Sequence, residues 1–196
     1  MRKIIFILLF LTNFPFLKAQ SITQTPEWKQ LLTDLKTEKW QEANDLSNQC
    51  LKTAIATEPG SNMIPILRYM VIFSESGLMN DGKLSQEKAL LAVKGFEGMV
   101  IALPGHPISV KRGFNSITMH DEKTDSLFIT ATNSAATNIF AFEYVALRDV
   151  WPVDDFKNNA GKMCRLSGTL TSITVEGHIL PRFRIIISDG QYQILN

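Results

Sequence analysis

Hydrophobic residues recur at helical spacing in the first half of the chain, from residue 25 to about residue 96. The first stripe of this kind consists of Trp28, Leu31, Leu32 and Leu35. Thr25 and Pro26 stand just before it, where an N-cap and a first helical residue are expected. The spacing therefore predicts a helix that begins at this point.

The same periodicity predicts three further helices. The second has an apolar face that begins at Trp40, and the sequence EPGSN at 58–62 ends it. The third, at 64–74, is apolar nearly all round, which predicts the most buried helix of this half. The fourth begins at Ser85, a good N-cap, and continues to Phe96.

After Gly95 the pattern changes to short runs of β-branched and aromatic residues that are separated by turn residues. In the run at 182–188, one side carries Phe183, Ile185 and Ile187, and the other carries Arg182, Arg184 and Ile186. Such runs predict a barrel or sandwich rather than a parallel sheet.

A short helix is predicted between the fourth and fifth runs. Pro152 lies near its start, Asp154 and Asp155 lie in its first turn, and Gly161 lies past its end. Adjacent residues on a helix point about 100° apart, so the two aspartates cannot share a proton as a catalytic pair would. We expect them to stabilise the start of the helix.

The helix pairs resemble tetratricopeptide repeats. The stripe at 28–35 is similar to the first helix of that motif, and the spacings that start at Ala43 and Ala89 are similar to its second helix. The two alanines lie 46 residues apart, whereas that repeat has a period of about 34 residues, and its glycine is absent. A generic four-helix bundle is the alternative for this half.

The order of elements after residue 95 is similar to the OB-fold, a barrel with a helix between its third and fourth strands. Gly168 lies within the run GKMCRLSGTLTSI, where the absence of a side chain would let a long strand coil across the barrel. The resemblance implies a closed barrel, one face of which binds oligonucleotides or oligosaccharides. A small sandwich is the alternative.

Together these patterns predict an α+β fold, in which antiparallel helical hairpins of four helices precede a small antiparallel β-barrel. The expected domains are a helical domain at 20–95 and a barrel domain at 96–196. The joint between them falls at Gly95 to Gly98.

Residues 1–19 have the pattern of a secretory signal peptide. Arg2 and Lys3 precede an unbroken apolar run at 4–11, and Ala19 stands where cleavage would fall. The run is far shorter than the ~20 residues of a membrane-spanning helix. We expect a periplasmic or secreted protein without a membrane-spanning segment after cleavage.

The charge balance argues against nucleic acid as a partner. The formal net charge is +1, and removal of the signal peptide with its three basic residues leaves it near −2. From Phe96 onward the chain has nine basic and ten acidic residues. A nucleic-acid-binding barrel needs a basic groove with exposed aromatic residues.

Cys50 and Cys164 are the only cysteines of the chain. An oxidising compartment permits one disulfide between them. Cys50 falls on the apolar side of a helix, and Cys164 shares strand parity with apolar residues. We expect two separate buried thiols, with a bridge as the alternative.

No motif of catalysis or of metal or cofactor binding stands out. His106 and His178 fall in turn sequences, where we expect exposed side chains, and His120 ends a strand. None of the three has the spacing of a zinc ligand set. No G-x-S-x-G elbow is present. We therefore expect no enzyme and no cofactor; a hydrolase with a site around His120 and Asp121 is the least favoured alternative.

Arg165, Arg182 and Arg184 should lie on neighbouring strands and face the same side. They are candidate ligand-binding residues for a partner carboxylate or an acidic sugar, although a solvated sheet face is the commoner origin of such a trio. The leading hypothesis is an exported, non-enzymatic adaptor of a Gram-negative-type envelope that binds a protein partner. The alternative is a protein that binds an acidic glycan or a small anion on its barrel face.

Overall fold

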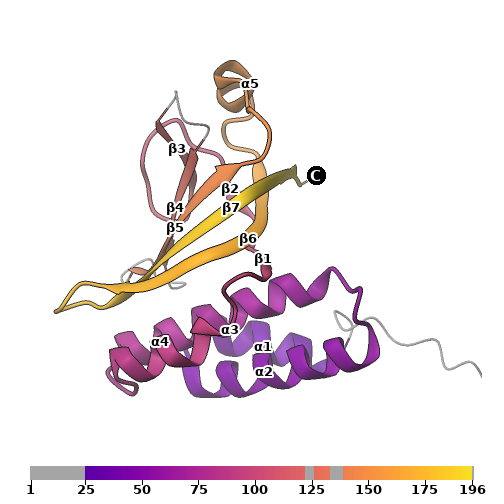
Figure 1. Ribbon diagram of the computed structural model, residues 1–196, viewed down its shortest axis with the longest axis vertical. Helices are drawn as coiled ribbons and strands as arrows, with labels where there is room; N and C mark the ends of the chain where they lie inside the picture. The colour runs from indigo at the N-terminus through magenta and orange to yellow at the C-terminus, as the bar shows by residue number, and fades with distance from the viewer. Residues whose placement is uncertain (1–24, 122–125, 133–138, 196) are drawn as a thin grey trace, which may run out of the picture.

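The computed structural model describes residues 25–121, 126–132 and 139–195, so the predicted signal peptide lies outside the described residues. Helices come first and a sheet follows, which confirms the α+β fold (Figure 1). Four of the five described helices precede the sheet. They are α1 Pro26–Lys36, α2 Trp40–Thr57, α3 Met63–Asn80 and α4 Gln86–Lys94. The fifth, α5 Val153–Asn158, lies between two strands in the second half of the chain.

Two helix starts are capped by side chains as predicted. Thr25 Oγ1 accepts a hydrogen bond from the Trp28 amide at 3.2 Å, and Ser85 Oγ accepts one from the Lys88 amide at 3.4 Å. Each cap satisfies an amide that the first turn leaves without a helical partner. These local interactions fix where α1 and α4 begin.

Helix α3 continues six residues beyond Ser74, the end that the apolar pattern predicts. The extension is bonded to α2 at its first residue, Glu75, and it buries Leu78 and Met79. Asn44 Nδ2 donates to Ser74 Oγ at 3.1 Å and to Glu75 Oε1 at 2.9 Å. All three side chains are buried, so the pair of helices encloses a polar cluster that the hydrophobic pattern does not reveal.

The strands form one mixed sheet with the order β1-β6-β7-β5-β4-β3, and β2 also pairs with β6. Neighbours are antiparallel except β5 and β7, which are parallel. The bounds are β1 Val100–Ala102, β2 His106–Pro107, β3 Ile117–Asp121, β4 Ser126–Thr132, β5 Ile139–Leu147, β6 Met163–Glu176 and β7 Arg182–Ile194.

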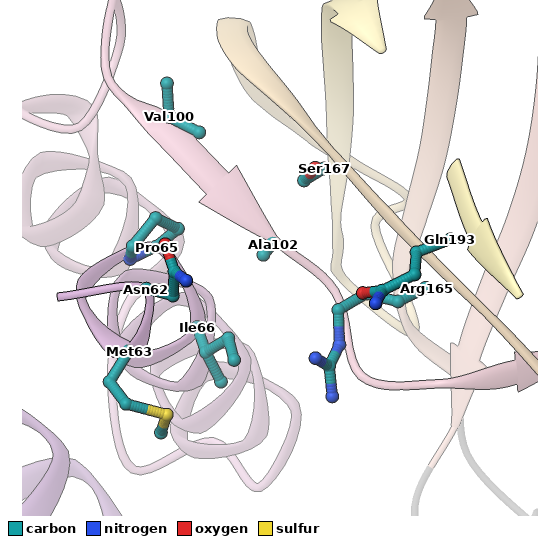
Figure 2. Close-up of a pocket in the computed structure, with 9 residues that line it drawn as sticks. All are labelled: Asn62, Met63, Pro65, Ile66, Val100, Ala102, Arg165, Ser167 and Gln193. Atoms are coloured by element: carbon teal, nitrogen blue, oxygen red, sulfur yellow. The ribbon is translucent and has the colours of Figure 1, made fainter. Parts of the chain in front are cut away.

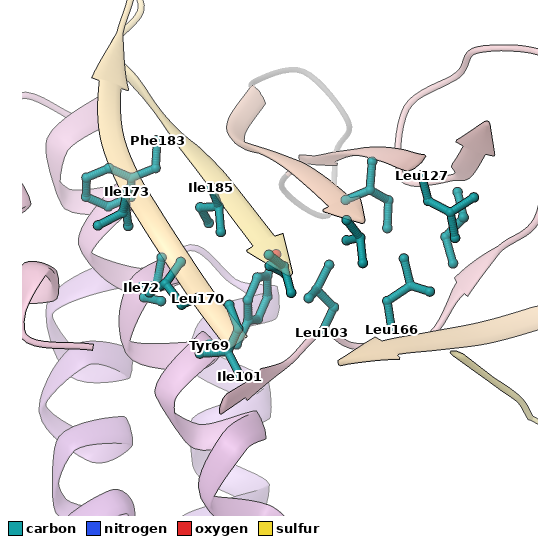
Figure 3. Packing of buried hydrophobic residues seen from close by; sticks show 14 of the residues in the cluster. Tyr69, Ile72, Ile101, Leu103, Leu127, Leu166, Leu170, Ile173, Phe183 and Ile185 are labelled. Carbon is teal, nitrogen blue, oxygen red and sulfur yellow. The ribbon is translucent and has the colours of Figure 1, made fainter. Parts of the chain in front are cut away.

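The sheet is open, so the prediction of a closed antiparallel barrel is wrong. Strands β1 and β3 lie at its two ends and do not pair with each other. Helices α3 and α4 cover the part of the apolar face that lies over β1, β5, β6 and β7, and residues of helices and sheet form one core (Figure 3). A helix and a closing strand would bury the same apolar positions, and strand alternation alone therefore does not distinguish them.

Gly168 has a physical reason other than barrel closure. A Cβ at this position would lie 2.6 Å from Ile187 Cγ2 and 2.6 Å from the Ser188 carbonyl oxygen of β7. The ladder between β6 and β7 shifts register between Ser167 and Thr169. Only glycine allows the two strands to approach so closely at this bulge.

Each of the helices that the structure describes is too short or too polar to span a membrane.

Candidate functional site

The structure separates the three arginines that the sequence groups together. Arg165 pairs with Gln193 in the β6–β7 ladder, whereas Arg182 pairs with Glu176 and Arg184 with Thr174. Arg165 therefore lies at one end of the ladder and the other two lie at the opposite end. The trio does not form one anion-binding patch.

Arg184 is engaged within the protein. Its Nη1 donates to Glu176 Oε1 at 2.9 Å, and its guanidinium carbon lies 4.5 Å from the centre of the Tyr144 ring. The hydrogen bond to Glu176 raises the pKa of Arg184. The carboxylate that a ligand would supply is already present in the chain.

Arg165 lines a pocket of about 410 Å³ between the start of α3, strand β1 and the adjoining ends of β6 and β7 (Figure 2). Its side chain extends from β6 toward the side of α3 that carries Ile66. The other lining residues are Asn62, Met63, Pro65, Ile66, Val100, Ala102, Ser167 and Gln193.

Arg165 is the only charged residue among those that line this pocket within the described part of the chain. Its Nε is buried and has no hydrogen-bond partner among the described residues. Asn62, Ser167 and Gln193 add neutral donors and acceptors. A cation beside neutral polar groups, without a carboxylate in the lining, can bind an anion.

The start of α3 adds little hydrogen-bonding capacity to this pocket. The Met63 amide donates to Ser61 Oγ at 3.3 Å, the Ile64 amide donates to the Ser61 carbonyl at 3.1 Å, and Pro65 has no amide hydrogen. The first turn contains no acidic residue, so the positive end of the helix dipole is uncompensated there. An anion in this pocket would accordingly depend mainly on Arg165.

His106 is buried, so the prediction of an exposed turn residue is wrong. It belongs to β2 and lies opposite Cys164 of β6. Burial lowers the pKa of His106 to about 4 and raises that of Cys164 to about 11. Both groups are neutral at pH 7, and the pair therefore lacks the ionised thiolate of a catalytic cysteine.

The other two histidines lie apart from this pair. His178 is exposed, as predicted. His120 is exposed at the end of β3 and packs edge-on against Tyr144, with the ring centres 5.3 Å apart. The side chain of Asp121 lies outside the described residues, and the hypothesis of a hydrolase around His120 and Asp121 stays a prediction. Among described residues no group of three or more His, Cys, Asp or Glu could hold a metal ion.

Sequence reasoning identified Arg165 but missed the rest of the pocket. Asn62 and Ile66 are separated from β6 by about a hundred residues of chain, and nothing in their local sequence marks them as lining residues. Asn62 is the N-cap of α3, but its side chain makes no capping hydrogen bond, which only the structure reveals.

Comparison of the chain with protein-family models, with curated proteins and with solved structures finds no match.

Proposed function

We propose that the protein is an exported, non-enzymatic binding protein of the cell envelope, and that it takes a carboxylate-bearing ligand in the Arg165 pocket. The observation that carries this proposal is the buried, unpartnered Nε of Arg165 in a pocket whose described lining contains no acidic residue. A guanidinium is always charged and presents a planar set of donors that matches a carboxylate.

Arg165 and Arg184 differ in whether the chain supplies them with a carboxylate partner. Arg184 already has its carboxylate partner in Glu176. Leaving a buried donor without a partner costs about 1–3 kcal/mol, so a ligand that satisfies Arg165 gains this energy on binding. Both arginines lie on half-buried positions of the same strand pair, which makes Arg184 a matched control.

Thermal denaturation in the presence of acetate, succinate and glucuronate tests this function. We expect at least one of these anions to raise the melting temperature of the wild-type chain and of Arg184→Gln, but not that of Arg165→Gln. Sodium chloride at matched ionic strength controls for general salt effects. Equal responses of Arg165→Gln and the wild-type chain, or no response to any carboxylate, would contradict the proposal.

A protein partner, which is the leading hypothesis from the sequence, is the second candidate here, and the tip of the β6–β7 hairpin favours it. Ile179 is 93% exposed and Leu180 is 55% exposed at this tip. The hairpin extends beyond the other strands of the sheet (Figure 1). Two apolar side chains on a projecting turn fit an apolar recess of a partner better than they fit water.

The paired variant Ile179→Ser with Leu180→Ser tests the second candidate. Pull-down from an envelope extract should recover one defined protein with the wild-type chain and lose it with this variant. Leu91→Ser is the control, since Leu91 is 77% exposed on α4 and does not belong to the hairpin. Recovery that is the same with the tip variant would rule out the tip as the contact.

A further inference from the structure

Strand β1 is an edge strand whose free edge faces the Arg165 pocket. It pairs with β6 alone and lies at the end of the strand order. The Leu103 amide donates to the Leu166 carbonyl at 2.9 Å, so Leu103 and, two residues earlier, Ile101 direct their backbone groups toward β6. The backbone groups of Val100 and Ala102 therefore point the other way.

Val100 and Ala102 both line the pocket. Val100 is 45% exposed and Ala102 is 6% exposed, so the edge is open to a ligand mainly at Val100. The Val100 carbonyl accepts a hydrogen bond from Arg68 Nη1 of α3 at 2.9 Å. Within the described part of the chain, the amide of Val100 and both backbone groups of Ala102 have no hydrogen-bond partner. An exposed edge of this kind is a template for another extended chain.

The charges around this edge match an extended chain that ends in a carboxylate. Arg68 lies beside Val100, and Arg165 lies beyond Ala102, at the far end of the short strand. Pro104 follows two residues after Ala102 and has no amide hydrogen, so an added strand finds no donor there. The edge therefore offers a ladder about three residues long with a guanidinium at its end.

We propose that the pocket binds the C-terminal segment of an extended peptide, which adds parallel to β1 and places its terminal carboxylate against Arg165. This inference rests on the proposed function and names the ligand class of the same pocket. Backbone hydrogen bonds to Val100 and Ala102 supply affinity without regard to sequence, and Arg165 selects the chain end.

Calorimetric titration of the full mature chain with short synthetic peptides tests the inference. The probe is acetyl-Ala-Val-Ala-Val-Ala with a free C-terminal carboxylate, compared with its C-terminal amide and with acetate. We expect the free acid to bind at least tenfold more tightly than either. The difference between acid and amide should disappear in Arg165→Gln and persist in Arg184→Gln.

Two peptides that are N-methylated at adjacent residues test strand addition itself. Successive amides of a strand point in opposite directions, so one methyl group should abolish binding and the other should leave it unchanged. This readout needs no variant of the protein and does not depend on whether a variant folds.

The outcomes separate the two proposals. If acetate or succinate binds through Arg165 but the free acid binds no more tightly, strand addition is overturned and the carboxylate site stands. Equal effects of the two methyl groups also overturn strand addition. Equal binding of acid and amide overturns the placement of the carboxylate. If neither peptides nor small carboxylates bind, the proposed function fails as well.

Discussion

Tyr69 of α3 donates a hydrogen bond from its hydroxyl to Glu143 Oε1 of β5 at 2.7 Å, deep in the core between the helices and the sheet. Glu143 is fully buried, and burial raises its pKa to about 8. Its second oxygen has no partner among the described residues. At neutral pH the carboxyl group is therefore mostly protonated, and a neutral contact joins the two halves of the chain.

The buried carboxyl group should make stability fall as pH rises. The native state holds a proton that the unfolded chain releases above pH ~4.5, so its contribution is complete below that pH and is lost toward pH 8. The slope approaches about 1.4 kcal/mol per pH unit. Urea denaturation at pH 6 and 8 should show Glu143→Gln gaining stability relative to the wild-type chain as pH rises.

Tyr69→Phe is the companion variant for this prediction. It keeps the ring, which stacks on Phe73, but removes the donor to Glu143. We expect a loss of about 1–3 kcal/mol, because a buried carboxyl group is left without its partner. The difference in free energy of unfolding between Glu143→Gln and the wild-type chain should depend on pH. If it is the same at pH 6 and pH 8, Glu143 does not titrate in this window.

The buried His106 should make the stability of the fold decrease as pH falls, which is the opposite of the effect of Glu143. Burial holds its pKa near 4 in the native state, although a hydrogen bond to the Asn115 backbone raises it somewhat. The unfolded chain takes up this proton below about pH 6.5, so the stabilisation is present above that pH and is lost as pH falls toward 4. Compared with His106→Gln, the wild-type chain should lose stability more steeply between pH 6.5 and 4.5. Parallel curves would contradict the buried neutral imidazole.

Local signals in the sequence predicted local structure well. The caps at Thr25 and Ser85 and the acidic first turn of α5 depend on residues within one turn of the chain. The turn after α2 and the short helix before β6 were found for the same reason. Such features need no knowledge of what packs against them.

Features that depend on distant partners were predicted poorly. A closed barrel would cover Ile101 and Leu170 with another strand, whereas the open sheet covers them with helices. The local sequence around these two residues does not distinguish the two cases. Arg165 and Arg184 share a face by parity, but the length of the β6–β7 ladder keeps them apart. His106 looked like a turn residue because β2 is only two residues long.

Gly77 should tolerate no side chain. It lies inside α3, where a Cβ would overlap the buried ring of Trp40. By helix propensity alone, Gly77→Ala would be stabilising by up to about 1 kcal/mol. We expect overpacking to dominate and to cost about 1–3 kcal/mol. Thermal melting shows whether Gly77→Ala raises or lowers the stability of the fold. Near-ultraviolet circular dichroism should show the displacement of Trp40.

Gly95→Ala is the matched control for that variant. Gly95 follows α4 with a φ of −64°, and a Cβ there has nothing within 4 Å. Its substitution should be neutral or stabilising by about 0.4–1 kcal/mol, because it reduces the freedom of the unfolded chain. If both variants melt at the wild-type temperature, Trp40 does not pack against Gly77 as the structure has it.

The two cysteines should behave as free thiols that react only slowly in the folded protein. Both are buried, and they belong to different hydrophobic clusters. Burial raises the pKa of each thiol, which leaves little of the reactive thiolate at pH 8. Titration with a disulfide reagent should detect two thiols at once in denaturant.

Without denaturant, Cys50 should react before Cys164. Cys50 is slightly exposed and lines a shallow pocket with Glu27 and Gln49, whereas Cys164 is fully buried. Cys50→Ser should therefore remove the faster phase, and Cys164→Ser should remove the slower one. A non-reduced protein that shows no thiol in denaturant would instead have a bridge. That bridge would contradict the structure, in which both thiols are free and belong to different hydrophobic clusters.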